Sequence, residues 1–135
     1  MFVHCCHCRD CQKQTGGAFA INALIERERV SLTAGAPAPH AMKTDSGHPH
    51  IIWRCDACGS ALWSDYGDRK TMIFLRVATL DDPAQMPPDV HIYTRSKLPW
   101  VRVPEGARAF EEYYDATAEW PAESIARRGA LQPLR

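Results

Sequence analysis

The sequence predicts a mainly β fold made of short strands and turns. Its 135 residues include 10 prolines and 8 glycines, which interrupt the chain too often for a long helical bundle. Several segments place apolar residues at alternate positions, as a half-buried strand does. The length and a hydrophobic content of 45% fit one domain with one modest core.

The strands are expected where apolar runs lie between turn signals. The expected strands cover residues 19–25, 30–33, a segment beginning near Ala41, 51–53, 61–63, 71–80 and 90–94. Segment 71–80 has too few polar positions for a solvated face, so it should be central in its sheet. Residues 110–114 are expected to form a short helix or an extended piece. One helix should follow Pro121, in a tail that packs weakly.

Charge and hydropathy restrict the partners of this protein. Lys plus Arg and Asp plus Glu number 16 each, so no net field attracts nucleic acid or an anionic membrane. No apolar run approaches the roughly 20 residues that cross a bilayer, and "MFVHCCHC" lacks the features of a secretory signal. We therefore expect a cytoplasmic protein with no nucleic-acid or membrane partner.

Five of the six cysteines lie in two metal-binding spacings. Cys6, Cys8 and Cys11 form C-x-C-x-x-C, and Cys55 and Cys58 form C-x-x-C before a glycine. Six cysteines would also suit three disulfides in a secreted domain, but the cytosol keeps thiols reduced. Thiolates converging at about 2.3 Å are the usual ligands of zinc, so the spacings predict zinc binding.

The spacings allow two divisions of these ligands. Cys8 and Cys11 with Cys55 and Cys58 would make a closed structural site of the zinc-ribbon kind, which leaves Cys6 without a role. Alternatively, Cys6, Cys8 and Cys11 form a three-thiolate site whose fourth position is open, as in catalytic zinc sites. Cys55 and Cys58 would then lack two partners.

Three blocks resemble the glutathione-dependent formaldehyde-activating enzyme family, which includes centromere protein V. They are "CHCRDCQKQTGGAFA", "RCDACGSALW" and "VATLDDPAQMPPDVHIYTRSKLPW", and "ARAFEEYY" extends the likeness to Tyr114. The resemblance implies a β-tent fold of short antiparallel sheets, with a zinc-binding domain over residues 1–114 and a helical tail over 115–135. It also implies a catalytic zinc on Cys6, Cys8 and Cys11 and a structural zinc held partly by Cys55 and Cys58.

The sequence departs from the family in one respect. Family members carry a further C-x-C on an N-terminal strand, and that pair completes the structural zinc site. The chain starts after this point, so we expect either that Met1 is an internal methionine of a longer gene product or that the structural site is half built. A sheet lacking that strand would have an unpaired edge, which is an association hazard or a homodimer interface.

The resemblance implies a zinc-dependent carbon-sulfur lyase. Such an enzyme condenses glutathione, its co-substrate, with formaldehyde or a related small electrophile to give S-hydroxymethylglutathione. The alternative is a non-catalytic, zinc-stabilised binding module of the centromere protein V type, because one fold hosts several functions. An exchangeable fourth position at Cys6, Cys8 and Cys11 favours the enzyme, and a fourth protein ligand favours the module.

Other side chains near the motifs have ordinary structural explanations. Glutathione has two carboxylates, and the cations that could meet them are Arg9, Lys13, Arg54, Arg95 and Lys97, each of which by itself is better explained as a solvated charge. His7, between two ligands, should point away from the metal, His91 should make a core hydrogen bond, and Cys5 should be a bystander thiol. The tryptophans expected in the core or the pocket wall are Trp53, Trp63 and Trp100.

Overall fold

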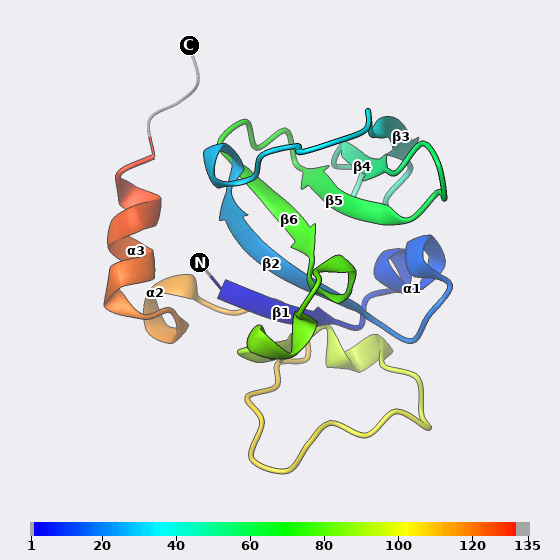
Figure 1. Cartoon of the computed structure of the whole chain (residues 1–135). Coiled ribbons are helices and arrows are strands. Elements are labelled where there is room, and N and C mark those ends of the chain that lie inside the picture. Colours follow the sequence, from blue (N-terminus) through cyan, green and yellow to red (C-terminus); the bar gives the residue numbers. More distant parts are fainter. Residues whose placement is uncertain (1, 132–135) are drawn as a thin grey trace.

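The computed structural model describes residues 2–131, and its strands join into one seven-stranded sheet (Figure 1). The strand order is β3-β4-β5-β6-β2-β1-β7, and every neighbouring pair is antiparallel except β1 with β7. The strands are β1 Phe2–Cys6, β2 Ala20–Glu26, β3 Ala38–Met42, β4 His50–Arg54, β5 Ala61–Tyr66, β6 Met72–Arg76 and β7 Val90–Ile92. The mainly β class is confirmed, with a single mixed sheet in place of small antiparallel ones.

The helices are short. They are α1 Arg9–Thr15, α2 Ala116–Glu119 and α3 Ala122–Gly129, with 3-10 turns at Arg27–Arg29, Val77–Thr79, Pro83–Gln85 and Thr94–Ser96. Helix α1 begins after Cys8, whose Sγ accepts a hydrogen bond from the Cys11 N–H at 3.3 Å, and ends at Gly16 with a left-handed φ of 66°. The α3 helix follows Pro121 as predicted.

Three elements were not expected from the sequence, namely β1, α1 and the four-residue helix α2. All five residues of β1 are buried, so this strand has no polar alternation for a sequence pattern to reveal. Its neighbours β2 and β7 cover both of its edges. The first helix is only seven residues long, and its capping residue is a cysteine, which is not a recognised helix-start signal.

Several local expectations are wrong. Residues 30–33 form no strand, because the chain leaves β2 through a 3-10 turn and these residues lie mostly exposed without a partner strand. The strand expected over 71–80 is central, between β5 and β2, but it ends at Arg76. Residues 110–114 form no helix, but as an irregular piece they follow the end of β7, where the Phe110 N–H donates to the His91 carbonyl at 2.9 Å, and Phe110 and Tyr114 pack against the core. Trp100 is 70% exposed and lies in no core.

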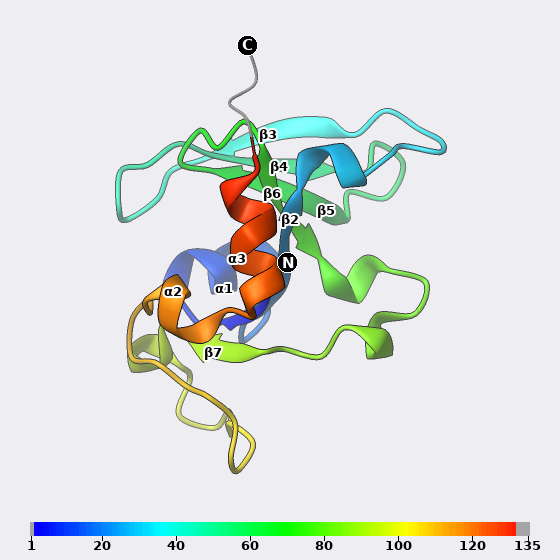
Figure 2. The same cartoon turned by 90° about the vertical axis from the view of Figure 1, so that its left-hand side faces the viewer.

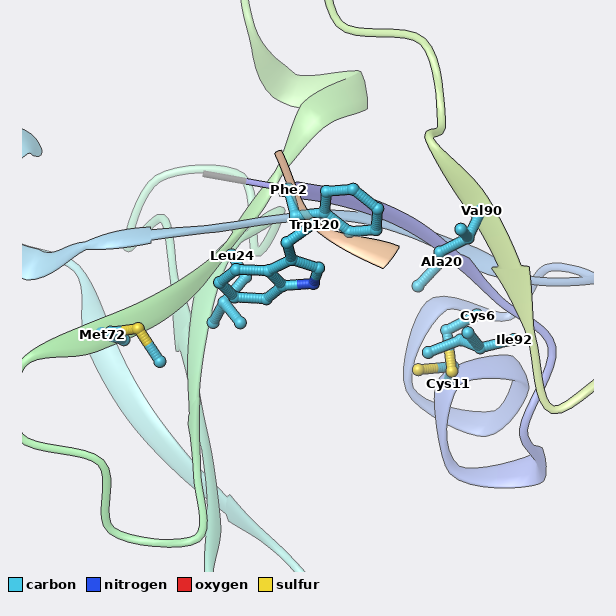
Figure 3. Close-up of a cluster of buried hydrophobic side chains, with 9 residues drawn as sticks. All are labelled: Phe2, Cys6, Cys11, Ala20, Leu24, Met72, Val90, Ile92 and Trp120. Carbon is cyan, nitrogen blue, oxygen red and sulfur yellow. The ribbon is translucent and has the colours of Figure 1, made fainter. Parts of the chain in front are cut away.

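The sheet buries side chains on both faces. Phe2 and Cys6 of β1 belong to a cluster that also includes Trp120, whereas Val3 packs on the opposite face with Ala23. Figure 3 shows the first cluster, in which Cys6 lies beside Cys11 at the end near α1. Because side chains of a strand alternate between faces, the adjacent residues of the N-terminal motif are divided between two environments.

The described part of the C-terminal tail packs firmly, so the prediction of weak packing is wrong for residues 115–131. Trp120 is only 6% exposed, and its ring stacks on Phe2 with centroids 5.5 Å apart. Arg127 of α3 donates to both carboxylate oxygens of Glu26 at 2.7 and 2.6 Å. In Figure 2 α3 stands in front of β2, the strand that contains Glu26. A domain boundary at residue 114 remains a prediction.

Replacing Glu26 by glutamine is expected to lower the free energy of unfolding by about 1.5–3 kcal/mol, the usual contribution of hydrogen bonds to charged groups. The side chain of Glu26 is 4% exposed and that of Arg127 is 33% exposed, so solvent screens the pair only in part. Urea unfolding at neutral pH measures this change. The exposed Glu105→Gln variant is the control, and equal stability of Glu26→Gln and the unchanged protein would contradict the prediction.

The same pair gives a pH dependence with a definite sign. The hydrogen bond from Arg127 holds the pKa of Glu26 below its ordinary value of 4.5. The resulting stabilisation is present above the carboxyl's unfolded-state pKa and is lost as the pH falls through its folded-state pKa. The stability difference between the protein and Glu26→Gln should therefore shrink in acid, which a pH series of urea unfolding curves tests.

Candidate metal centre

Three cysteines converge where β1 gives way to α1. Cys6 is the last residue of β1, Cys8 caps α1, and Cys11 lies in the first turn of that helix. Their Sγ atoms all lie within 4.8 Å of one another. Cys6 and Cys11 are buried, and Cys8 is half-buried. The helix start bends the chain so that three sulfurs face one point, which is the donor set of a thiolate metal site.

The three thiols share their protons unequally. The pKa of Cys8 is lowered because it accepts hydrogen bonds from the thiols of Cys11 and Cys6. The pKa of Cys6 is raised, because its own hydrogen bonds to Cys11 and Cys8 and its burial favour the protonated form. A metal ion that binds there would take the place of the thiol protons, because cysteine binds metals as the thiolate.

The cluster lies in the wall of a cavity of about 600 Å³. This volume is within the usual range for small-molecule sites, roughly 300–1,000 Å³. Its lining mixes charged and polar side chains with aromatic ones, among them His4, Phe74, Tyr93 and Tyr113. Tyr93 has a φ of 56°, a left-handed conformation that is costly for a bulky residue and is found most often at functional sites.

A buried arginine, which the sequence analysis missed, also lines this cavity. Arg76 is 5% exposed at the end of β6, and it pairs in register with Asn22 of β2. Its guanidinium donates to the Asn22 side-chain oxygen, to Gln14 at 2.8 Å and to Ser64 at 3.3 Å, and its Nε has no partner within residues 2–131. In the sequence, the position of Arg76 as a charged residue within the most apolar expected strand is the signal that could have identified it.

The charge of the buried Arg76 bears on whether the three-cysteine cluster suits a zinc ion. Burial lowers the pKa of Arg76, whereas the neighbouring sulfurs of Cys11 and Cys6 act to raise it. Within the described chain, no carboxylate forms an ion pair with this guanidinium. A buried cation needs a counter-charge. Three thiolates and a divalent ion together carry one negative charge, which Arg76 would balance, so both the donors and their surroundings fit zinc.

The structure places only two of the five cations expected near glutathione in the cavity wall. Arg9 and Arg95 line the cavity, together with Arg69, which the sequence analysis did not single out. The other three do not line it. Lys13 lies 3.8 Å from Asp45, Arg54 donates to the carbonyls of Gly59 and Gln14, and Lys97 donates to the carbonyl of Val101.

Cys55 and Cys58 lie apart from the cluster, on the turn between β4 and β5. The turn is tight, because the Cys55 N–H donates to the Ser60 carbonyl at 2.8 Å and the Gly59 N–H donates to the Cys55 carbonyl at 2.9 Å. Gly59 adopts a φ of 74°, which glycine alone tolerates readily. In residues 2–131 no third metal-ligating side chain joins this pair, so the closed Cys8, Cys11, Cys55 and Cys58 site is not assembled.

The histidines of the motif are also divided between the two sides of β1. His4 faces the cavity, where its Nε2 lies 2.5 Å from the Tyr114 hydroxyl, and the Trp120 indole N–H donates to the same hydroxyl at 2.7 Å. His7 is fully buried, and its Nε2 lies 3.0 Å from Nδ1 of His91. Burial lowers the pKa of His7 to about 4, so its imidazole is neutral near pH 7.

Comparison with known proteins identifies a family for most of the chain. The family model for the glutathione-dependent formaldehyde-activating enzyme matches residues 1–96, which is more than half of the chain. A search of the curated proteins finds no match. Among the described residues, no helix has both the length and the apolar character that a membrane crossing requires.

Proposed function

Because the chain belongs to the glutathione-dependent formaldehyde-activating enzyme family, we propose that it is a zinc-dependent carbon-sulfur lyase. Its reaction would join glutathione to formaldehyde or to a related small electrophile. The observation that carries this proposal is the convergence of the Cys6, Cys8 and Cys11 sulfurs on the cavity wall, with no fourth Cys, His, Asp or Glu in the group among the described residues. A site with three protein ligands leaves one position for an exchangeable molecule.

The reaction needs no oxidant or reductant. A carbon-sulfur bond forms between the thiol and the aldehyde carbon, the carbonyl π electrons move to oxygen, and the thiol proton is transferred to that oxygen. A zinc ion bound by the three cysteines would lower the pKa of an incoming thiol and polarise an aldehyde oxygen.

The cavity supplies the remaining requirements of such a reaction. Arg76 would balance the charge of the three thiolates, while Arg9 and Arg69 offer cations to the two carboxylates of glutathione; Arg95 is already paired with Glu112.

Cobalt substitution tests this assignment. Glutathione should change the ligand-field and sulfur-to-cobalt bands of the cobalt protein, because its thiolate would enter the open position at the metal. S-Methylglutathione is the matched control, since it keeps both carboxylates and lacks a free thiol, and it should leave the bands unchanged. A spectrum that glutathione does not alter would contradict the enzyme and favour the non-catalytic binding module.

We keep Cys55 and Cys58 as proposed ligands of a second, structural zinc, separate from the three-cysteine site. The double variant Cys55→Ser, Cys58→Ser is therefore expected to retain zinc on Cys6, Cys8 and Cys11. Metal analysis of the purified protein measures this. Loss of all metal from the variant would instead support one zinc-ribbon site and would count against the catalytic assignment.

A further inference from the structure

A second group of metal-ligating side chains lies on the opposite face of β1. Cys5, His7 and His91 each present one sulfur or nitrogen atom, and these atoms all lie within 4.8 Å of one another. Cys5 and His91 are direct partners in the parallel pairing of β1 with β7. His7 continues the line of β1 two residues beyond Cys5, and its N–H donates to the Ile92 carbonyl at 3.0 Å. The strand register therefore brings the three side chains together.

The distances match those of a tetrahedral ion. Zinc bonds of about 2.3 Å to sulfur and 2.0–2.1 Å to nitrogen place a sulfur and a nitrogen about 3.6 Å apart and two nitrogens about 3.3 Å apart. Here the Cys5 Sγ lies 3.6 Å from Nε2 of His7, and that nitrogen lies 3.0 Å from Nδ1 of His91. A shift of a few tenths of an ångström would complete the geometry.

The surroundings suit a divalent ion held by three protein ligands, whose fourth position is open to a water molecule. Cys5 is 2% exposed and His7 is fully buried, while the half-buried His91 gives access from the surface. The ring of Phe19 packs edge-on against His7 with centroids 5.4 Å apart. One thiolate and two neutral imidazoles leave a divalent ion with a net charge of only +1, which reduces the cost of burying it.

We propose that Cys5, His7 and His91 bind a zinc-class divalent transition-metal ion that fastens β7 to the start of α1. This site is separate from Cys6, Cys8 and Cys11, because Cys5 and Cys6 point to opposite faces of β1. Its donor set of one sulfur and two nitrogens is softer than that of magnesium or calcium and typical of zinc.

The test uses the whole chain with Cys55→Ser and Cys58→Ser, so that this pair binds no metal. After loading with excess zinc under reducing conditions and removal of free metal, two zinc ions per chain are expected. Adding His91→Asn should reduce the content to one, whereas His40→Asn, at an exposed histidine, should leave two. One zinc before the histidine change, or two after His91→Asn, would overturn the proposal.

Cobalt spectra give an independent readout if a variant loses stability. Sulfur-to-cobalt absorption rises with the number of thiolates, so the proposed site should contribute a weak band and the three-cysteine site a strong one. The Cys8→Ser change in the same background should leave only the weak band, and adding Cys5→Ser should remove it. A weak band that persists after Cys5→Ser, or no band after Cys8→Ser alone, would overturn the proposal.

Discussion

Replacing Cys8 by serine is expected to remove the metal from the three-cysteine site and to lower the catalysed rate by roughly 100-fold or more. Changes in residues that only contact a metal ligand already cost about 10–100-fold, and this change removes a ligand itself. Serine suits this test structurally. Cys8 caps α1 through its side chain, and a serine oxygen can accept the same hydrogen bond from the Cys11 N–H. The fold should therefore survive while the thiolate is lost.

The assay for this variant must separate catalysis from the spontaneous addition of thiols to formaldehyde. The measured quantity is the rate of exchange between free formaldehyde and S-hydroxymethylglutathione, minus the rate without protein. Asp115→Ser is the matched control, since Asp115 caps α2, outside the cavity, and serine preserves that cap. Full activity of Cys8→Ser with its zinc content unchanged would rule out the three-cysteine site as the catalytic centre.

Replacing Arg76 by glutamine should weaken zinc binding and lower kcat/KM by about 10–100-fold, the usual effect of changing a charge next to a metal site. The variant removes the buried cation that would balance the thiolates, although glutamine can still bond to Asn22 and Ser64. Arg76→Lys keeps the charge and should restore part of the affinity. The exposed Arg102→Gln variant should behave like the unchanged protein.

Two readouts separate the roles that Arg76 could have. A lower zinc affinity with a lower kcat indicates that Arg76 acts through the metal as a positioning residue. A raised KM with unchanged zinc affinity would show instead that it binds a carboxylate of glutathione. Unchanged values of both quantities would show that the buried guanidinium serves only the packing between β2 and β6.

Local patterns predicted much of the fold. Alternating or continuous apolar runs identified β2, β4, β5 and β7, and the proline at the start of α3 identified that helix. The strand predicted for residues 30–33 is not formed, because these residues have no neighbouring strand to pair with and β propensity alone does not make a strand. Trp120 and Arg127 show the reverse effect, since a polar, proline-broken tail is held by one buried ring and one ion pair.

The amino-acid sequence by itself predicted thiolate metal binding, because Cys6, Cys8 and Cys11 are close in the chain, but its spacings left two divisions of the ligands open; the start of α1 brings these three sulfurs together. Tertiary structure alone decided what surrounds them. Arg76 contacts Asn22 across 54 residues, and His91 contacts His7 across 84. Contacts between such distant strands depend on sheet register, which leaves no local period in the sequence. The alternation of side chains along β1 also places Cys5 and Cys6 on opposite faces of the sheet, although they are neighbours in the sequence.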